Sequence, residues 1–229
     1  MDIVAPFFEH GLEIGGQFGI EQDELAAGGV REAQRLGVFR RLGVLKAPEP
    51  EILRAVLGAV RIPVNVLVRP RGGDFVFSEK EVSQMLSDIV VCRKAGAAGI
   101  VIGALRPDGS VDTPVMQRLI AAARPLPVTF HRAFDVCADP LAAFEEICAL
   151  GCERLLTSGH EADAYAGRSL IAGLVGCARG RITVMAGCGV RPHNIAALQA
   201  ATAVPEYHST AHGPDGRTVR EVVRQLVEE

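Results

Sequence analysis

Residues 62–103, IPVNVLVRPRGGDFVFSEKEVSQMLSDIVVCRKAGAAGIVIG, hold one complete unit of the pattern that decides the fold. The segment runs from a β-branched stretch through a glycine-containing turn into a helical stretch that begins near Ser78, and it ends in a second β-branched stretch. Such alternation is typical of parallel strands joined by crossover helices. The unit therefore predicts a βαβ arrangement.

The same unit recurs up to the C-terminus. It predicts further helices that begin near Asp112, Asp139, Ala162 and Arg191, a last helix in 216–229, and six strands at 62–68, 99–103, 127–131, 154–158, 182–187 and 205–210. The first 60 residues are less regular. They fit an opening strand at 2–8, a helix at 19–37, a strand at 38–46 and a helix at 49–60.

Eight strands and their helices predict an α/β fold, a (β/α)8 TIM-type barrel, with room for irregularity in the first two strands. A chain of 229 residues fits one such domain over 1–229. The alternative is an open doubly wound sheet. It is disfavoured because no G-x-G-x-x-G follows a first strand.

Composition narrows the function classes. Twenty-four Lys and Arg against 27 Asp and Glu give a formal net charge of −3, so we expect no nucleic-acid partner. No apolar run reaches the roughly 18 residues of a spanning helix, and the N-terminus lacks a basic signal region, so we expect a cytoplasmic protein without a membrane partner. The six cysteines form no C-x-x-C pair and are expected to be free thiols.

In a barrel of this kind the active site lies at the carboxyl ends of the strands. Arg69 and Arg71 follow the strand at 62–68 and stand beside Gly72 and Gly73. Two guanidiniums next to glycines that let a ligand approach the backbone predict an anion clamp. The alternative is a pair of arginines that bond carboxylates around the barrel rim.

The strand at 127–131 ends in His131, and Asp135 lies four residues further on. We expect these two as catalytic residues because an imidazole can act as acid or base; a purely structural histidine is the alternative. Glycine-rich loops before helices expose backbone N–H groups suited to anions. Polar and glycine positions at the strand ends are therefore predicted to bind an anion together with Arg69 and Arg71: Arg132, Thr157, Ser158, Gly187, Gly189 and Ser209.

A soft metal ion is the other ligand to weigh. Thiolate and imidazole suit Cu(I) or zinc, and four candidates lie at or just past strand ends: His131, Cys137, Cys188 and His208. Their spacing matches no metal motif. Lys80 and Lys94 fall on predicted helices, so a Schiff-base aldolase is disfavoured.

Five segments together resemble the CutC family, from Ile62 to the C-terminus: PVNVLVRPRGGDFVFSEKEV (63–82), GIVIGALRPDGSVD (99–112), LPVTFHRAFDVCADPLAA (126–143), RLLTSGHEADA (154–164) and RITVMAGCGVRPHNI (181–195). The resemblance implies a TIM-type barrel, a cytoplasmic location and copper as a ligand. The first 60 residues depart from the family, because its Glu-Val-Cys and G-G-A-D-R-I-E-L-C strands have no counterpart here. Asn65 also stands where members have His.

The resemblance implies a copper homeostasis protein of the CutC type, in which Cys137 and Cys188 are the surviving thiols. The alternative from the residues themselves is a TIM-barrel enzyme for a small anionic or phosphorylated metabolite, with His131 moving protons. A barrel without a working site is the third possibility. Either function takes a small anion or a metal ion as partner, and a homo-oligomer is left open.

Overall fold

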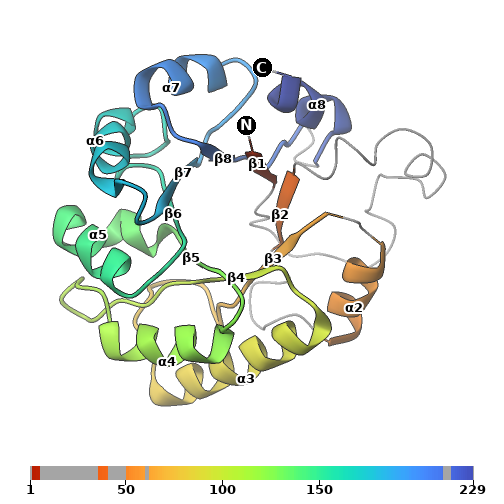
Figure 1. Ribbon diagram of the computed structural model, residues 1–229, viewed down its shortest axis with the longest axis vertical. Helices are drawn as coiled ribbons and strands as arrows, with labels where there is room; N and C mark the ends of the chain where they lie inside the picture. Colours follow the sequence, from red (N-terminus) through yellow and green to blue (C-terminus); the bar gives the residue numbers. More distant parts are fainter. Residues whose placement is uncertain (1, 6–35, 41–49, 60–61, 214–217, 229) are drawn as a thin grey trace.

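The computed structural model describes residues 2–5, 36–40, 50–59, 62–213 and 218–228 (Figure 1). Eight parallel strands follow one another around a closed barrel, and the first pairs with the last. Their bounds are β1 (Asp2–Ala5), β2 (Leu36–Arg40), β3 (Val64–Leu67), β4 (Gly99–Ile102), β5 (Val128–Phe130), β6 (Arg154–Thr157), β7 (Thr183–Gly187) and β8 (Glu206–His208).

Helices surround the ring of strands, as Figure 1 shows. They are α2 (Pro50–Ala59), α3 (Glu79–Ala95), α4 (Thr113–Ala123), α5 (Pro140–Ala149), α6 (Arg168–Ala178), α7 (Ile195–Thr202) and α8 (Arg220–Glu228), with a short 3-10 helix, η1 (Arg132–Val136), after β5. The predicted (β/α)8 fold is thus confirmed. None of the described helices is both long and apolar enough to cross a membrane.

Local capping explains where several helices start. Ser78 caps α3 in a reciprocal capping box with Glu81, while Asp112 caps α4 and Asp139 caps α5, each followed by a proline in the first turn. These starts were predicted. The helix expected near Ala162 begins only at Arg168, and the one expected near Arg191 begins at Ile195.

The opening segment is described only in part. β1 starts where the predicted opening strand starts and pairs in parallel with both β2 and β8. The strand predicted at 38–46 overlaps β2, which ends at Arg40, and the helix predicted at 49–60 corresponds to α2. Residues 19–35 of the helix predicted at 19–37 lie outside the described residues, and its last two, Leu36 and Gly37, belong to β2 instead, so the prediction was wrong there.

The core has two layers, because side chains of a strand alternate between its faces. Residues such as Ile100, Phe130 and Leu155 pack outward against the helices in one large buried cluster. A second, separate cluster fills the middle of the barrel and consists of Leu67, Val101, Leu156 and Met185. The described side chains therefore form a packed floor inside the barrel, and we look for a ligand site above it, beyond the strand ends.

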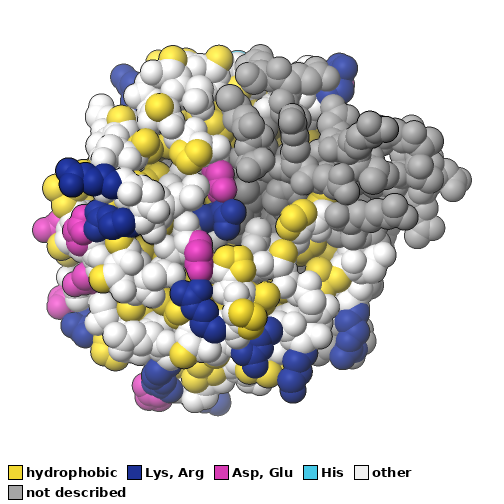
Figure 2. Space-filling model, viewed as in Figure 1, with side chains coloured by type: hydrophobic (Ala, Val, Ile, Leu, Met, Phe, Trp, Pro, Cys, Tyr) yellow, Lys and Arg dark blue, Asp and Glu magenta, His cyan; other side chains and the backbone are white. Residues whose placement is uncertain are grey.

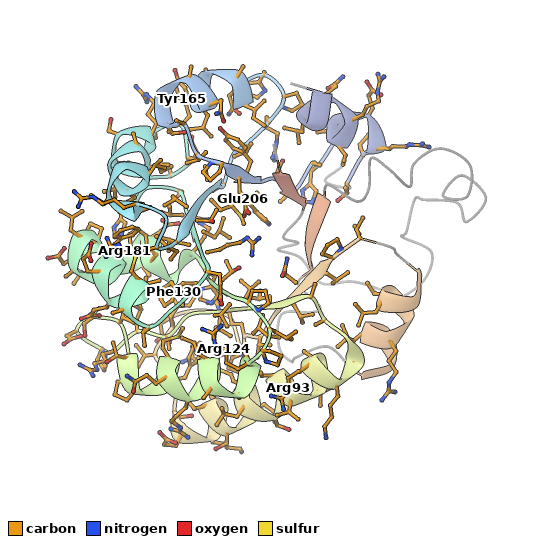
Figure 3. All side chains as sticks on the ribbon, in the orientation of Figure 1. Arg93, Arg124, Phe130, Tyr165, Arg181 and Glu206 are labelled. Atoms are coloured by element: carbon orange, nitrogen blue, oxygen red, sulfur yellow. The ribbon has the colours of Figure 1, made fainter. Side chains whose placement is uncertain are left out.

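The amino-terminal side of this floor carries an ion pair between inward positions on β6 and β8. Arg154 Nε lies 2.8 Å from Glu206 Oε2, and the Glu206 side chain is only 10% exposed. Figure 3 shows Glu206 toward the centre of the ring, with Arg93, Arg124 and Arg181 further out. Over the described part of the face in Figure 2, basic and acidic side chains lie interleaved.

Candidate functional site at the barrel mouth

His131 is placed by the end of β5 and the start of η1. Its Nδ1 accepts a hydrogen bond from the Ala133 N–H at 3.1 Å, so a neutral ring carries its proton on Nε2. The side chain is 3% exposed, and its buried Nε2 has no hydrogen-bond partner among the residues that the structure describes. His131 therefore presents a buried N–H donor.

The ring of His131 fits because its neighbours leave room for it. A Cβ at Gly103 would come within 2.6 Å of the imidazole, so only glycine tolerates this packing at the end of β4. On another side the ring lies 5.0 Å from that of Phe75. Burial, with a smaller contribution from the positive charge of Arg69, lowers the pKa of His131 to about 3.

His208, at the end of β8, has a similar environment. It stands beside Gly187 of β7, where a Cβ would lie 3.2 Å from the His208 Cβ. Burial and the charge of Arg132 lower its pKa to about 3 as well. Both imidazoles are thus neutral at physiological pH, in surroundings that disfavour positive charge.

The two arginines after β3 have different surroundings. Arg71 lies 2.6 Å from Glu81 Oε1 and 2.7 Å from Asp74 Oδ1, and it also donates to the carbonyl of Val76. These bonds match the alternative in which it bonds carboxylates at the rim. Arg69 donates to the carbonyl of Gly73 at 2.5 Å and covers the ring of Phe75, with Cζ 4.3 Å from the centroid.

Asp135 is an acceptor for the ends of β5 and β6. Its side chain is 5% exposed and accepts from Arg132 Nε at 2.7 Å, from both the N–H and the hydroxyl of Ser158 at 3.0 Å, and from the Thr157 hydroxyl. The His160 N–H is 3.4 Å away. Asp135, Thr157 and Ser158 were predicted as ligand-binding or catalytic residues, and here they bind one another.

The four predicted metal ligands do not gather in one place. Cys137 Sγ lies 3.4 Å from His160 Nε2, whereas Cys188 Sγ donates to the carbonyl of Ala162 at 3.2 Å. Over the described ranges, no group of three or more His, Cys, Asp or Glu side chains is arranged to hold a metal. The predicted set of His131, His208, Cys137 and Cys188 is thus divided between separate surroundings.

The turn after β7 brings the remaining predicted residues to the rim. Cys188 and Gly189 both have positive φ, 76° and 73°, which bends the chain sharply after Gly187. Ser209 donates to the carbonyl of Val190 at 2.7 Å and so ties the end of β8 to this turn. Ser209 thus has a bond that accounts for it structurally, and its anion-binding role stays a prediction.

Fold and site define a class: a closed (β/α)8 barrel with two neutral histidines and flanking arginines at the carboxyl ends of its strands. The CutC family model matches residues 25–213, so the chain belongs to the CutC family. The match starts well before Ile62, where the motif resemblance begins.

Individual relatives agree. The family protein CutC of Parabacteroides distasonis is 52% identical over 161 residues, 70% of this chain and 66% of the relative; that of Histophilus somni is 46% identical over 72% of this chain and 68% of the relative. The matches therefore span about two thirds of these relatives' length.

Solved structures support the fold. A Streptococcus agalactiae structure, named CutC with a provisional assignment to copper homeostasis, has a TM-score of 0.71 at 28% identity and covers 80% of this chain and 89% of its own. A Coccidioides immitis protein, provisionally a deoxyribose-phosphate aldolase, has a TM-score of 0.63 at 13% identity, covering 98% of this chain and 84% of its own, and shows the fold alone.

Two residues of the site were missed from sequence. His160 lies beyond β6 in a positive-φ conformation, 62°, and no local pattern pairs it with Cys137 twenty-three positions earlier. Phe75 follows the glycine pair in the RPRGGDF string, yet its contacts with both Arg69 and His131 depend on how the loop folds back over the barrel.

Proposed function

We propose that this chain is a cytoplasmic copper homeostasis protein of the CutC type that binds Cu(I) as cargo between Cys137 and His160. The observation that carries the proposal is the 3.4 Å separation of Cys137 Sγ and His160 Nε2. Metal bonds to nitrogen and sulfur of about 2.0–2.3 Å, as zinc forms, allow one ion to contact two donors at this distance. A thiolate and a neutral imidazole are donors that suit Cu(I).

The electrostatic surroundings of Cys137 favour a cation. Burial and the nearby carboxylates of Asp139 and Asp135 raise the pKa of the thiol to about 11. A negative potential that opposes thiolate formation also attracts a positive ion, and a metal that binds sulfur displaces the proton. The same raised pKa speaks against Cys137 as a nucleophile, because reactive thiols have lowered pKa values.

The surroundings of His131 and His208 at the mouth disfavour a cation, which is why we place copper at Cys137 instead. Burial, with a smaller contribution from the charges of Arg69 and Arg132, lowers the pKa values of those two histidines, and surroundings that disfavour a bound proton also disfavour Cu(I). Of the predicted ligands, Cys137 is thus retained in the proposal, and His160 is added.

Anaerobic titration with Cu(I) against a chromophoric competitor tests the proposal. We expect one-to-one binding that Cys137→Ser and His160→Asn each weaken at least about tenfold, the cost of roughly 1.4 kcal/mol for a lost ligand. Cys188→Ser is the matched control, since it removes a thiol elsewhere on the same face. Loss of copper in Cys188→Ser alone, or unchanged binding in Cys137→Ser, would refute the assignment.

The alternative is an enzyme for a small anionic metabolite, favoured by the buried N–H of His131. With a pKa of about 3, however, this imidazole is a weak base and stays neutral, so it suits hydrogen-bond donation better than proton shuttling.

We also propose that residues 1–229 form one domain. That the chain forms a homo-oligomer stays a prediction.

A further inference from the structure

We infer that the barrel mouth binds a small phosphate-type oxyanion, which accepts a hydrogen bond from the neutral Nε2–H of His131 and is attracted by Arg69. This site is separate from the proposed copper pair. It rests on three features of the mouth: a buried donor without a described partner, the tautomer of that donor, and the sign of the surrounding charge.

The first feature is a buried hydrogen-bond donor that has no acceptor among the described residues. A buried donor without a partner costs about 1–3 kcal/mol relative to one that is bonded. His131 Nε2 is such a donor, and the buried hydroxyl of Thr210, two positions beyond His208, also lacks a partner among the described residues. An acceptor that enters the mouth recovers this cost.

The second feature fixes what kind of ligand fits. Because Nδ1 of His131 accepts from the Ala133 N–H, Nε2 can only donate while the ring is neutral. The ligand must therefore offer an acceptor. A metal ion is excluded at Nε2 in this tautomer, since it would need the nitrogen lone pair that the proton occupies.

The third feature selects an anion over a neutral acceptor such as water. The charge of Arg69 acts on His131, and that of Arg132 acts on His208. Asp135 offsets part of this charge because it pairs with Arg132, while Asp74 and Glu81 are engaged by Arg71 at the rim. In a site of low dielectric, an oxyanion gains more from these cations than water does.

The floor and walls set the size of the ligand. Among the described side chains, Leu67, Val101, Leu156 and Met185 form a buried apolar cluster below the mouth, so we place the anion above it. Phe75 lies against both Arg69 and His131 and shields one side from water. A compact head group such as phosphate or sulfate fits this description, free or as part of a small metabolite.

Calorimetry with inorganic phosphate and with sulfate on the full chain tests the inference, beside the variants His131→Leu, His131→Gln and Arg69→Gln. We expect His131→Leu to weaken binding about 10-fold to 100-fold, the range for a lost charge-assisted hydrogen bond. His131→Gln, which keeps an Nε2 donor, should retain most of the affinity. Arg118→Gln is the control, because Arg118 pairs with Glu79 on the outer helices.

A second readout separates binding from folding. The imidazole ¹⁵N spectrum should place the His131 proton on Nε2, and phosphate should shift that resonance and no signal of the exposed histidines. Absence of a shift at millimolar phosphate, or equal losses in Arg118→Gln and Arg69→Gln, would overturn the inference. Tighter binding of glycerol phosphate than of phosphate would support an organic phosphate, and equal binding the free oxyanion.

The two proposals fail independently. Cys137→Ser should leave phosphate binding unchanged, and His131→Leu should leave Cu(I) binding unchanged. If His131→Leu removed both ligands, the mouth and the copper pair would be one site, and this inference would be wrong.

Discussion

The buried carboxylate of Asp135 gives the strongest test of what holds the mouth together. It accepts from five donors on four residues: Arg132, Thr157, Ser158 and His160. Replacing Asp135 by Ala leaves the partly exposed Arg132 guanidinium and the buried donors of Thr157 and Ser158 without their acceptor. Individual bond energies are not additive, so we expect a total of about 3–5 kcal/mol, mainly from the buried donors that lose their acceptor.

Asp135→Asn should cost less, about 1.5–3 kcal/mol, because one acceptor oxygen remains, although the charge is lost and an NH2 group replaces the other oxygen. For a chain of this length, 1 kcal/mol corresponds to about 2–4 °C, so Asp135→Ala should melt roughly 6–20 °C lower than the unmodified protein. Circular dichroism melts and urea titrations measure both effects.

The matched control for this series is Asp108→Asn. Asp108 is an exposed carboxylate that bonds only locally, to the N–H and hydroxyl of Ser110, so its neutralisation should leave the midpoint essentially unchanged. If Asp135→Asn melted together with Asp108→Asn, the carboxylate would not organise the ends of β5 and β6, and the reasoning would be refuted.

Three further changes have expected outcomes. Gly187→Ala should cost about 1–3 kcal/mol, because the new Cβ would overlap Leu156 Cδ1, whereas Gly173→Ala on α6 has open space around it and should be neutral or stabilising in the same denaturation assay. Glu206→Ala should destabilise the barrel more than the double replacement Arg154→Met with Glu206→Leu, since an unpaired buried charge costs more than none; a double-mutant cycle measures this. Acid should lower the stability of the fold. His131 and His208 have pKa values of about 3 in the folded chain and 6.5 in the unfolded chain, so the unfolded chain binds more protons below pH 6.5. Each histidine should therefore lower the free energy of unfolding by about 1.4 kcal/mol per pH unit as the pH falls from 6.5 toward 3. Stability above pH 7 should not depend on them, and a slope that His131→Gln leaves unchanged would argue against a neutral buried His131.

The sequence predicted those parts of the structure that depend on local chemistry. Strand alternation located the mouth, and the caps at Ser78, Asp112 and Asp139 located three helix starts, because a cap is decided within four residues. The helix start predicted near Ala162 was wrong, because the amphipathic pattern of this segment suits a helix. The segment instead forms a loop, in which the Ala164 N–H bonds the carbonyl of Cys188, a contact made across two strands.

Which side chains meet at the site depends on such long-range contacts, and this was harder to predict from the sequence. Arg71 looked like a ligand residue beside Arg69, yet Glu81, ten positions on, serves both Arg71 and the capping box of α3. Cys137 and His160 meet only because Asp135 ties the loop after β5 to the end of β6. No spacing rule expresses either arrangement.

The division of the predicted metal set matches the charges beside its members. Arg69 acts on His131, whereas Asp139 and Asp135 act on Cys137. Burial and the charge of Arg69 lower the pKa of His131, while burial and the two carboxylates raise the pKa of the Cys137 thiol. A cation and an anion are therefore favoured six residues apart, which one mixed site of His131, His208, Cys137 and Cys188 could not accommodate. Asp135 keeps the two environments distinct because it binds Arg132 on one side and orders the His160 loop on the other.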